Sequence, residues 1–486
     1  MVSTSTEVER DTRFFGHPRG LANLFGVEMW ERFSFYGMQG ILAIYLYYEA
    51  SRGGLGMAQE TALGIVGAYG GLVYLSAVVG AWVADRLFGS ERTLFYSAIL
   101  VMVGHISLAV LPGFAGIGVG LACVALGSGG LKSNATAIVG TLYAADDERR
   151  DGGFTLFYMG INIGAFVGPL LTGLAQKEFG FHLGFGLAAI GMALGLIQYA
   201  IGRKNLGEKA REIPNPLPAS KRVLVGGAVL VVAALIVVLV LAGVIRAENL
   251  ANLVVWLVGV ISVIYFVVIL SSKKITADER SRVYSFIPMF IASAAFFSLY
   301  QQQFTVVQAY TDQRLDRDLF GWQMPVAWVN SIVAVFVIVF APIFAAIWTK
   351  LGSRQPSSPM KFVFGTVLMG AAFLLFLPMV GTGANGSPLP ALVGILFVFT
   401  AAELFLSPVG LSLSTKLAPT AFRTQMVALN FLSISFGTAM SGKLAQYYDT
   451  QDEAPYFGII GGVAIAIGVL LLFGTPLIRK LMKGVH

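Results

Sequence analysis

Charged residues, cysteine and histidine are all scarce in this chain of 486 residues. Only 12% of its residues are charged, whereas a soluble chain carries about 25%. The single cysteine, Cys123, excludes a disulfide framework and a zinc site built from several cysteines. The four histidines do not show the spacing of two metal ligands on one helix turn. We therefore expect no metal and no cofactor.

Apolar residues dominate what is present. Hydrophobic residues make up 56% of the chain, and the mean hydropathy is +0.76. The net charge is +7. The basic residues lie between the apolar runs and do not form a patch that would bind nucleic acid. We expect an integral membrane protein that is surrounded by a lipid bilayer and has no nucleic-acid partner.

Fourteen stretches of the sequence are long and apolar enough to cross a bilayer, for which a helix needs roughly 20 residues. Lys and Arg gather in every second connection between these stretches and after the last one. The positive-inside rule therefore places both termini in the cytoplasm. The predicted spans are 21–48, 61–87, 92–111, 115–141, 152–176, 183–202, 221–244, 252–272, 285–311, 323–349, 360–380, 388–416, 424–446 and 456–478.

The spans divide into groups of six, two and six. Two polar stretches, 203–222 and 273–284, bracket a pair of plain helices that are rich in Val and Leu. Six plus six is the layout of the major facilitator fold, in which two pseudo-repeated halves enclose a site at the bilayer midplane. We predict an all-α membrane protein with an N-terminal six-helix bundle at 1–205, a linker with two inserted transmembrane helices at 206–280, and a C-terminal six-helix bundle at 281–486.

The first span carries an unusual cluster of ionisable residues. Glu28, Glu31 and Arg32 share one helix face with Tyr36. Each charge costs at least roughly 2.5–3.5 kcal/mol inside a membrane, so such residues indicate function by default. A neutralised structural triad is one interpretation. We favour the other, in which a carboxylate takes up a proton while Arg32 changes partners between it and a substrate carboxylate.

Two further charges, on different spans, are candidates for a buried ion pair. Lys132 follows a run of glycines that allows another helix to come close. Glu403 lies near the middle of span 388–416, one turn before Ser407. A static Lys132–Glu403 bridge is the simpler interpretation. We favour a bridge that forms in one carrier state and breaks in another, because permanent buried pairs seldom add stability.

Weaker candidates lie on other spans. Asn162 suits a packing hydrogen bond and a ligand contact equally well. Asp85 and Arg86, at the end of the second span, form either a gate or a solvated loop pair. Taken together, one half of the chain offers cations and the other an anion, an arrangement that suits a zwitterion with separated charges.

Several motifs resemble the signatures of one family, the proton-coupled oligopeptide transporters of the major facilitator superfamily. HPRGL at 17–21 leads into Glu28-x-x-Glu31-Arg32-Phe33, which is similar to the first-helix signature of that family. GAWVADRLFGSERT and FTLFYMGINIGAFVGP are similar to its two long signatures, and the match continues in order across nearly the whole chain. The two-helix insertion is also what bacterial members carry.

The resemblance implies a symporter that imports di- and tripeptides with protons by alternating access and has no catalytic residue. It implies an inner (plasma) membrane location and no obligate protein partner. It assigns proton coupling to Glu28, Glu31, Arg32, Lys132 and Glu403. The substrate-binding candidates are Arg32, Tyr36, Tyr74, Lys132, Asn162, Asn330, Glu403, Ser407 and Asn430, and the gating candidates are Gln39, Gln301, Asp85 and Arg86.

Some positions depart from the family pattern. Gln39 and Gln301 stand where the resemblance implies an arginine and an acid that form an outer salt bridge. Loss of one partner would leave a buried charge unpaired, whereas loss of both is almost neutral. We therefore predict a Gln39–Gln301 hydrogen bond in place of the ion pair. In addition, Phe35, Val333 and Asn430 stand where the family usually has Tyr, Asn and Trp.

Two alternatives stay open at this point. A carrier of the same fold would serve another small solute, such as nitrate or a peptide-like metabolite. A membrane-embedded enzyme is the rival from a different class. GSGGLKS is similar to a nucleotide-binding loop, but it lies inside an apolar helix rather than after a strand. We therefore expect a carrier and not an enzyme.

Overall fold

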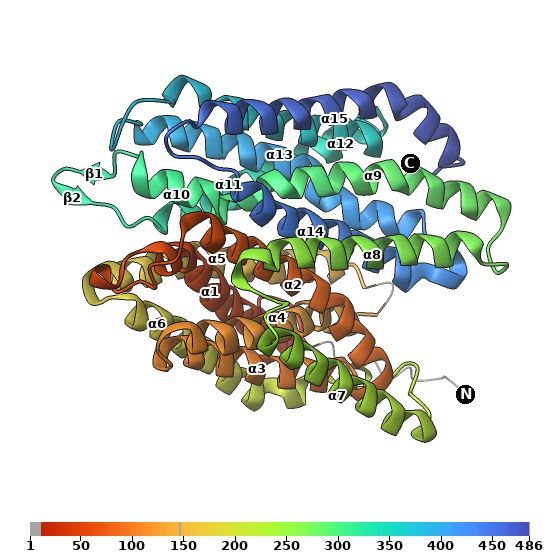
Figure 1. Ribbon diagram of the computed structural model, residues 1–486. Coiled ribbons are helices and arrows are strands. Elements are labelled where there is room, and N and C mark those ends of the chain that lie inside the picture. The colour runs from red at the N-terminus through yellow and green to blue at the C-terminus, as the bar shows by residue number, and fades with distance from the viewer. Residues whose placement is uncertain (1–10, 145–146, 486) are drawn as a thin grey trace, which may run out of the picture.

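The computed structural model describes residues 11–144 and 147–485, and its architecture is all-α. The long helices run nearly side by side (Figure 1). The predicted all-α membrane architecture is confirmed. The first eight helices are α1 (Arg19–Tyr47), α2 (Gln59–Val83), α3 (Ser90–Val110), α4 (Gly113–Thr141), α5 (Arg150–Phe179), α6 (Phe181–Gly202), α7 (Ala219–Leu241) and α8 (Leu250–Ser271). They are followed by α9 (Ala277–Tyr300), α10 (Val306–Gln313), α11 (Trp328–Leu351), α12 (Ser358–Leu374), α13 (Leu389–Lys416), α14 (Arg423–Ala445) and α15 (Ala454–Leu481).

Most helices begin and end within a few residues of the predicted bounds, and two of the differences have a clear local cause. The span predicted to start at 323 starts at Trp328, because β2 (Trp322–Gln323) pairs with β1 (Asp318–Leu319) in a short antiparallel hairpin. The C-terminal bundle was predicted from 281, but α9 begins at Ala277. A capping box explains this earlier start, since Thr276 accepts the backbone N–H of Glu279 and the Glu279 side chain accepts that of Thr276.

Two of the long helices do not have the composition of a membrane span. Within the described residues, twelve helical segments are long and apolar enough to cross a membrane, and α1 and α14 are not among them. Three charged side chains lie in the middle of α1, and α14 is rich in Ser and Thr. Most residues of both helices are buried, because α1 packs against α5 and α6 while α14 packs against α2, α8 and α9. Neighbouring helices therefore shield their polar groups from lipid.

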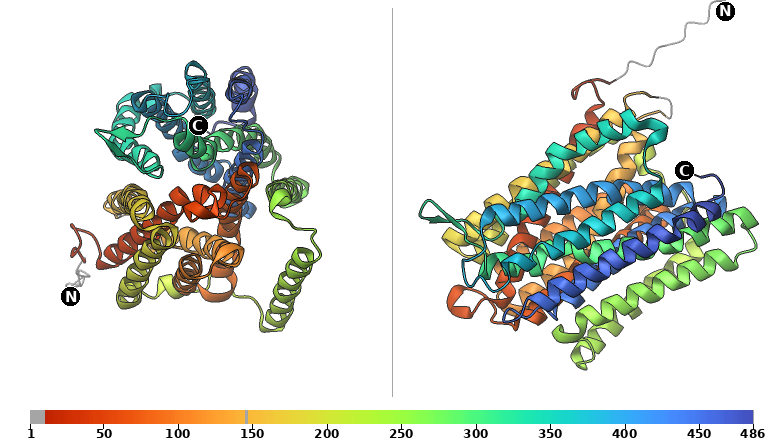
Figure 2. Two further views of the ribbon diagram at one scale, coloured as in Figure 1. Left: turned by 60° about the vertical axis from the view of Figure 1, so that its left-hand side comes forward. Right: turned by 90° about the horizontal axis from the view of Figure 1, so that it is seen from above.

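The inserted pair α7 and α8 lies at the periphery. In α7, no residue is buried, and the helix stands apart from the others in Figure 2 (left, yellow-green). The apolar side chains of α7 therefore face the surroundings along its whole length. In contrast, α8 packs against α2 and α14 and so contacts helices of both halves of the chain.

The bundle has two distinct ends. The start of α1 and the end of α15 lie at one end, which we call the terminus end, and the β1–β2 hairpin lies at the other, the hairpin end (Figure 1). The halves meet where α2 crosses α14. A Cβ atom on Gly67 would lie 2.3 Å from the backbone of Gly442. Only glycine permits so close an approach of two helix backbones.

Candidate functional site

Two neighbouring cavities between the helices share part of their lining. The smaller one, which we call the central cavity, has a volume of about 340 Å³ and is lined by helices of both halves. The larger one, the vestibule, has a volume of about 1200 Å³ and is lined mostly by α11, α12 and α13. Tyr158, Glu403, Ser407 and Leu411 line both cavities.

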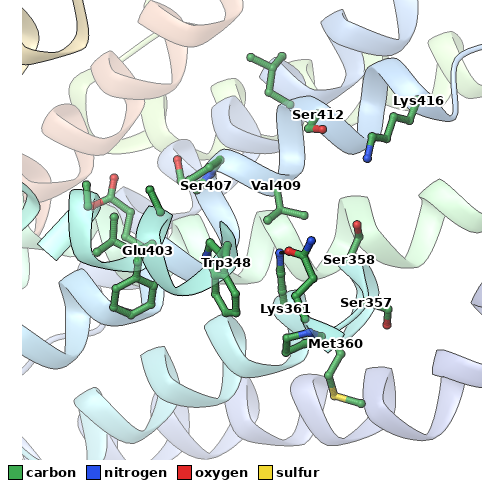
Figure 3. A pocket seen from close by; sticks show the side chains of 18 of the residues that line it. Trp348, Ser357, Ser358, Met360, Lys361, Glu403, Ser407, Val409, Ser412 and Lys416 are labelled. Atoms are coloured by element: carbon green, nitrogen blue, oxygen red, sulfur yellow. Dashed lines mark hydrogen bonds between the residues drawn. The ribbon is translucent and has the colours of Figure 1, made fainter. Parts of the chain in front are cut away.

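The vestibule leads from the middle of the bundle to the terminus end. Figure 3 shows Glu403 and Ser407 at one side of it, and Lys361 and Lys416 farther along. Arg479, close to the end of α15, lines the vestibule as well. Glu403 is the only acidic residue among the described residues that line the vestibule, so its mouth is basic.

Of the α1 triad, Arg32 lines the central cavity, whereas Glu28 and Glu31 are not among the described residues that line it. Arg32 Nε lies 2.8 Å from Glu28 Oε1 and 3.0 Å from Glu31 Oε2, and all three side chains are buried. Ser128 Oγ of α4 donates a hydrogen bond to Glu31 Oε1. Within the part of the chain that the structure describes, the two terminal nitrogens of Arg32 have no hydrogen-bond partner. One edge of the guanidinium thus neutralises the glutamates, while its other nitrogens remain available to an anionic group.

The predicted Lys132–Glu403 ion pair is not formed. Lys132 Nζ lies 4.3 Å from the centre of the Tyr74 ring, in a cation–π contact. Glu403 Oε2 accepts a hydrogen bond of 2.7 Å from the Tyr300 hydroxyl. Because both side chains have other partners here, the interpretation as a static bridge is wrong. A bridge that forms in another carrier state stays a prediction.

Most of the other predicted binding residues line the central cavity. Tyr36 stacks on Phe304 with ring centres 6.0 Å apart. Asn162 Nδ2 donates to the carbonyl oxygen of Tyr158 at 2.9 Å, one helix turn away. This bond occupies its amide nitrogen but leaves its side-chain oxygen available. Ser407 and Asn330 also line the cavity.

Asn430 is the exception, and its assignment as a binding residue is corrected here. It lines neither cavity, since Phe431 and Ile434 are the α14 residues that do so at this point. Asn430 faces α13 instead, where a Cβ atom on Gly410 would lie 2.9 Å from Asn430 Oδ1. The rotation of α14, which is set by its close crossing with α2, determines which residue reaches the cavity.

The predicted gate between Gln39 and Gln301 is also corrected. Both side chains are buried and line the central cavity, but no hydrogen bond joins them in the described structure, and Gln39 Oε1 has no partner. An acid at the hairpin end closes the halves instead. Asp312 of α10 accepts hydrogen bonds from the hydroxyls of Tyr47 at 2.9 Å and Tyr48 at 2.6 Å.

This cluster, Asp312 with Tyr47, Tyr48 and Arg317, was not found from the sequence. Arg317 lies 3.6 Å from Asp312 Oδ1 and neutralises its charge. The tyrosines and the acid are separated by 264 and 265 residues, so no local pattern relates them. The signal in the sequence that could have indicated this cluster was an acidic residue, Asp312, beside the membrane-spanning part of α9 and α10.

Further contacts join the two halves. At the hairpin end, Gln313 Nε2 donates to Gln59 Oε1 at 2.6 Å, and near the middle of α2, Ser435 Oγ donates to the carbonyl oxygen of Gly71 at 2.7 Å. The halves are therefore in contact at the hairpin end, while the vestibule adjoins the central cavity on the side of the terminus end.

Asp85 and Arg86 lie outside both cavities. Their side chains are partly exposed and 3.5 Å apart. Asp85 Oδ1 accepts a hydrogen bond of 2.9 Å from Asn215, and the backbone of Arg86 accepts one from Leu217. The pair therefore holds the linker against the end of α2. A role in gating stays a prediction.

Comparisons with known proteins agree with this geometry. The model of the POT family matches residues 91–461. The uncharacterized transporter YclF of Bacillus subtilis is 44% identical over 475 residues, which cover 97% of this chain and 96% of that protein. A di-/tripeptide transporter of Lactococcus lactis subsp. cremoris is 40% identical over 487 residues, which cover 97% and 98% of the two chains.

A solved structure shows the same fold. The peptide transporter POT in complex with sulfate is 45% identical and superposes with a TM-score of 0.93 over 98% of each chain. This likeness confirms the predicted major facilitator fold. The family model spans most of the chain, and the relatives match it over nearly its full length. The chain therefore belongs to the POT family and is a multi-pass membrane transporter.

Proposed function

We propose that this chain imports di- and tripeptides together with protons, by alternating access across the inner membrane. The observation that carries the proposal is the charge distribution of the central cavity. The unpartnered nitrogens of Arg32 lie in the wall formed by the first half, and Glu403 lies in the wall formed by the second. A short peptide with a free carboxylate and a free ammonium group is complementary to these two walls.

The triad of α1 supplies a route to proton coupling. The charge of Arg32 is shared between Glu28 and Glu31 when the cavity is empty. A peptide carboxylate that binds the guanidinium takes part of that charge away from the glutamates. A proton on one of the glutamates then neutralises the negative charge that Arg32 no longer compensates. Peptide binding and proton binding therefore support one another.

The positive-inside rule gives the orientation of the carrier in the membrane. Lys and Arg are concentrated in the connections at the terminus end, which we therefore place in the cytoplasm together with both termini. The vestibule then opens to the cytoplasm, and the closed hairpin end faces outward. This is the conformation from which a peptide is released. We expect the carrier to work without a cofactor, without an obligate protein partner and without an enzymatic step.

Transport into proteoliposomes tests the proposal. Purified protein should accumulate di-alanine and tri-alanine when the outside is more acidic than the inside, and a proton ionophore should abolish this accumulation. The variants Glu28→Gln and Glu31→Gln should lose gradient-driven uptake. Glu208→Gln, which alters an exposed linker glutamate, is the matched control and should not. Binding of peptides without gradient-driven uptake would refute proton coupling. Uptake of nitrate or another small solute, but not of peptides, would favour the alternative carrier.

A further inference from the structure

Buried amide side chains gather in the part of the central cavity that lies between α1, α11 and the short turn that follows α9. Gln39, Gln301 and Asn330 all line the cavity there. Gln39 is 3% exposed and Asn330 is 6% exposed. Among the described residues, Gln39 Oε1 and Asn330 Oδ1 have no hydrogen-bond partner. Buried polar atoms are nearly always paired in folded proteins, so two orphaned acceptors on side chains that line one cavity indicate a missing partner.

The orientation of Asn330 is held by its neighbours. Asn330 Nδ2 donates to Gln308 Oε1 at 3.2 Å, and Gln308 Nε2 in turn donates to the carbonyl oxygen of Gly40. A Cβ atom on Gly40 would lie 3.3 Å from Asn330 Nδ2, so Asn330 is directly beside the residue that follows Gln39. Since the amide nitrogen of Asn330 is engaged in this chain of bonds, its oxygen is the atom left for a ligand.

The surroundings of these amides determine what kind of ligand fits. Arg32, Lys132 and Glu403 are the only charged side chains among the described residues that line the central cavity. Under the proposed function, on which this inference rests, they bind the two charged ends of the peptide. The amides therefore face the remaining part of the ligand, its side chain.

We propose that Gln39, Gln301 and Asn330 form a subsite for an uncharged hydrogen-bond donor on the peptide side chain. Carboxamides and hydroxyls, as in Gln, Asn, Ser and Thr, are the groups that satisfy carbonyl acceptors without bringing in a charge. An apolar side chain leaves the acceptors unpaired. A lysine side chain offers donors, but its charge would be desolvated without a counter-ion in this subsite.

Two near-isosteric dipeptides provide the sharpest test. Ala-Gln and Ala-Met have side chains of similar length, and only the first can donate hydrogen bonds. Each is used to compete with labelled di-alanine for uptake into proteoliposomes that contain the full chain. We expect Ala-Gln to inhibit at a concentration about tenfold lower than Ala-Met. Hydrogen bonds to uncharged acceptors account for a difference of about this size. Ala-Lys should inhibit no better than Ala-Met.

Single substitutions test whether the preference for Ala-Gln over Ala-Met arises at this subsite. Gln39→Met and Asn330→Leu should each reduce the ratio between the two dipeptides to about threefold or less, as expected when one of two acceptors is lost. Gln198→Met is the control, because Gln198 bonds the backbone of α1 on the far side of that helix and lines neither cavity. This variant should keep the wild-type ratio even if its transport rate falls.

The outcomes separate the two proposals. If di-alanine is taken up but Ala-Gln and Ala-Met inhibit equally, the subsite is refuted and peptide transport stands. A preference for Ala-Lys over Ala-Gln would also refute a subsite for uncharged donors. If no peptide is taken up or competes, the proposed function itself fails. The comparison of dipeptides on the unmodified chain is decisive even where a variant does not fold.

Discussion

The closure of the hairpin end leads to a quantitative prediction. Removal of both hydroxyls by Tyr47→Phe with Tyr48→Phe should favour the conformation that is open at this end. The substitutions keep the aromatic rings, including the ring of Tyr48 that lies under the Arg52 guanidinium at 3.5 Å. Only the hydrogen bonds of 2.9 and 2.6 Å to Asp312 are lost.

The size of the effect follows from these contacts. A hydrogen bond to a charged group contributes about 1.5–3 kcal/mol. We take the lower limit of about 1.5 kcal/mol for each hydrogen bond. The reason is that water can bind Asp312 in place of the two hydroxyls when the hairpin end opens. Arg317, at 3.6 Å, can move closer to Asp312 and offset part of the loss. The double substitution should therefore shift the equilibrium by about 2 kcal/mol, roughly 30-fold toward the open conformation.

Distances between spin labels measure this equilibrium. The only native cysteine, Cys123, is replaced by Ser, and labels are attached through Ala50→Cys in the first half and Phe320→Cys in the second, both at exposed positions of the hairpin end. Pulsed electron paramagnetic resonance should show mostly short distances in the parent. A clear population of longer distances should appear in the double variant.

Tyr45→Phe is the matched control. Tyr45 lies at the same end of α1, but its ring contacts Phe181 and Phe185, and its hydroxyl makes no hydrogen bond within the described residues. It should leave the distances unchanged. If the double variant gives the distances of the parent, or if Tyr45→Phe shifts them equally, then the Asp312 cluster does not hold this end closed.

Two further predictions concern the charged ends of the peptide. Glu403→Gln should weaken competition by di-alanine about 10–100-fold, the contribution of a charged hydrogen bond, but should leave N-acetylated di-alanine nearly unaffected. Equal losses for both ligands would contradict a role of Glu403 at the ammonium group. Arg32→Lys keeps the charge but cannot contact the glutamates and the ligand at once, as the guanidinium can. It should reduce gradient-driven uptake at least tenfold and narrow the preference for di-alanine over its C-terminal amide; an unchanged preference would contradict carboxylate binding by Arg32.

Much of the fold was predictable from the sequence because the bilayer imposes a length and a composition on each span. Even α1 and α14, whose composition is not that of a membrane span, were recognised as spans. The triad of α1 was predictable for a geometric reason. Residues three and four positions apart lie on one face of a helix, and Arg32 contacts both glutamates.

The order of the amino acids is enough to identify the residues that are too costly to leave in lipid and those that share a helix face. Which side chains meet across helices depends on how the helices pack. This packing placed Glu403 on Tyr300 rather than on Lys132, turned Asn430 away from the cavity, left Gln39 and Gln301 apart, and brought Asp312 to two tyrosines more than 260 residues away. The physical reason is that these contacts depend on the rotation and crossing of whole helices. Those are set by glycine contacts, such as Gly67 on Gly442, that are formed only when the two halves come together.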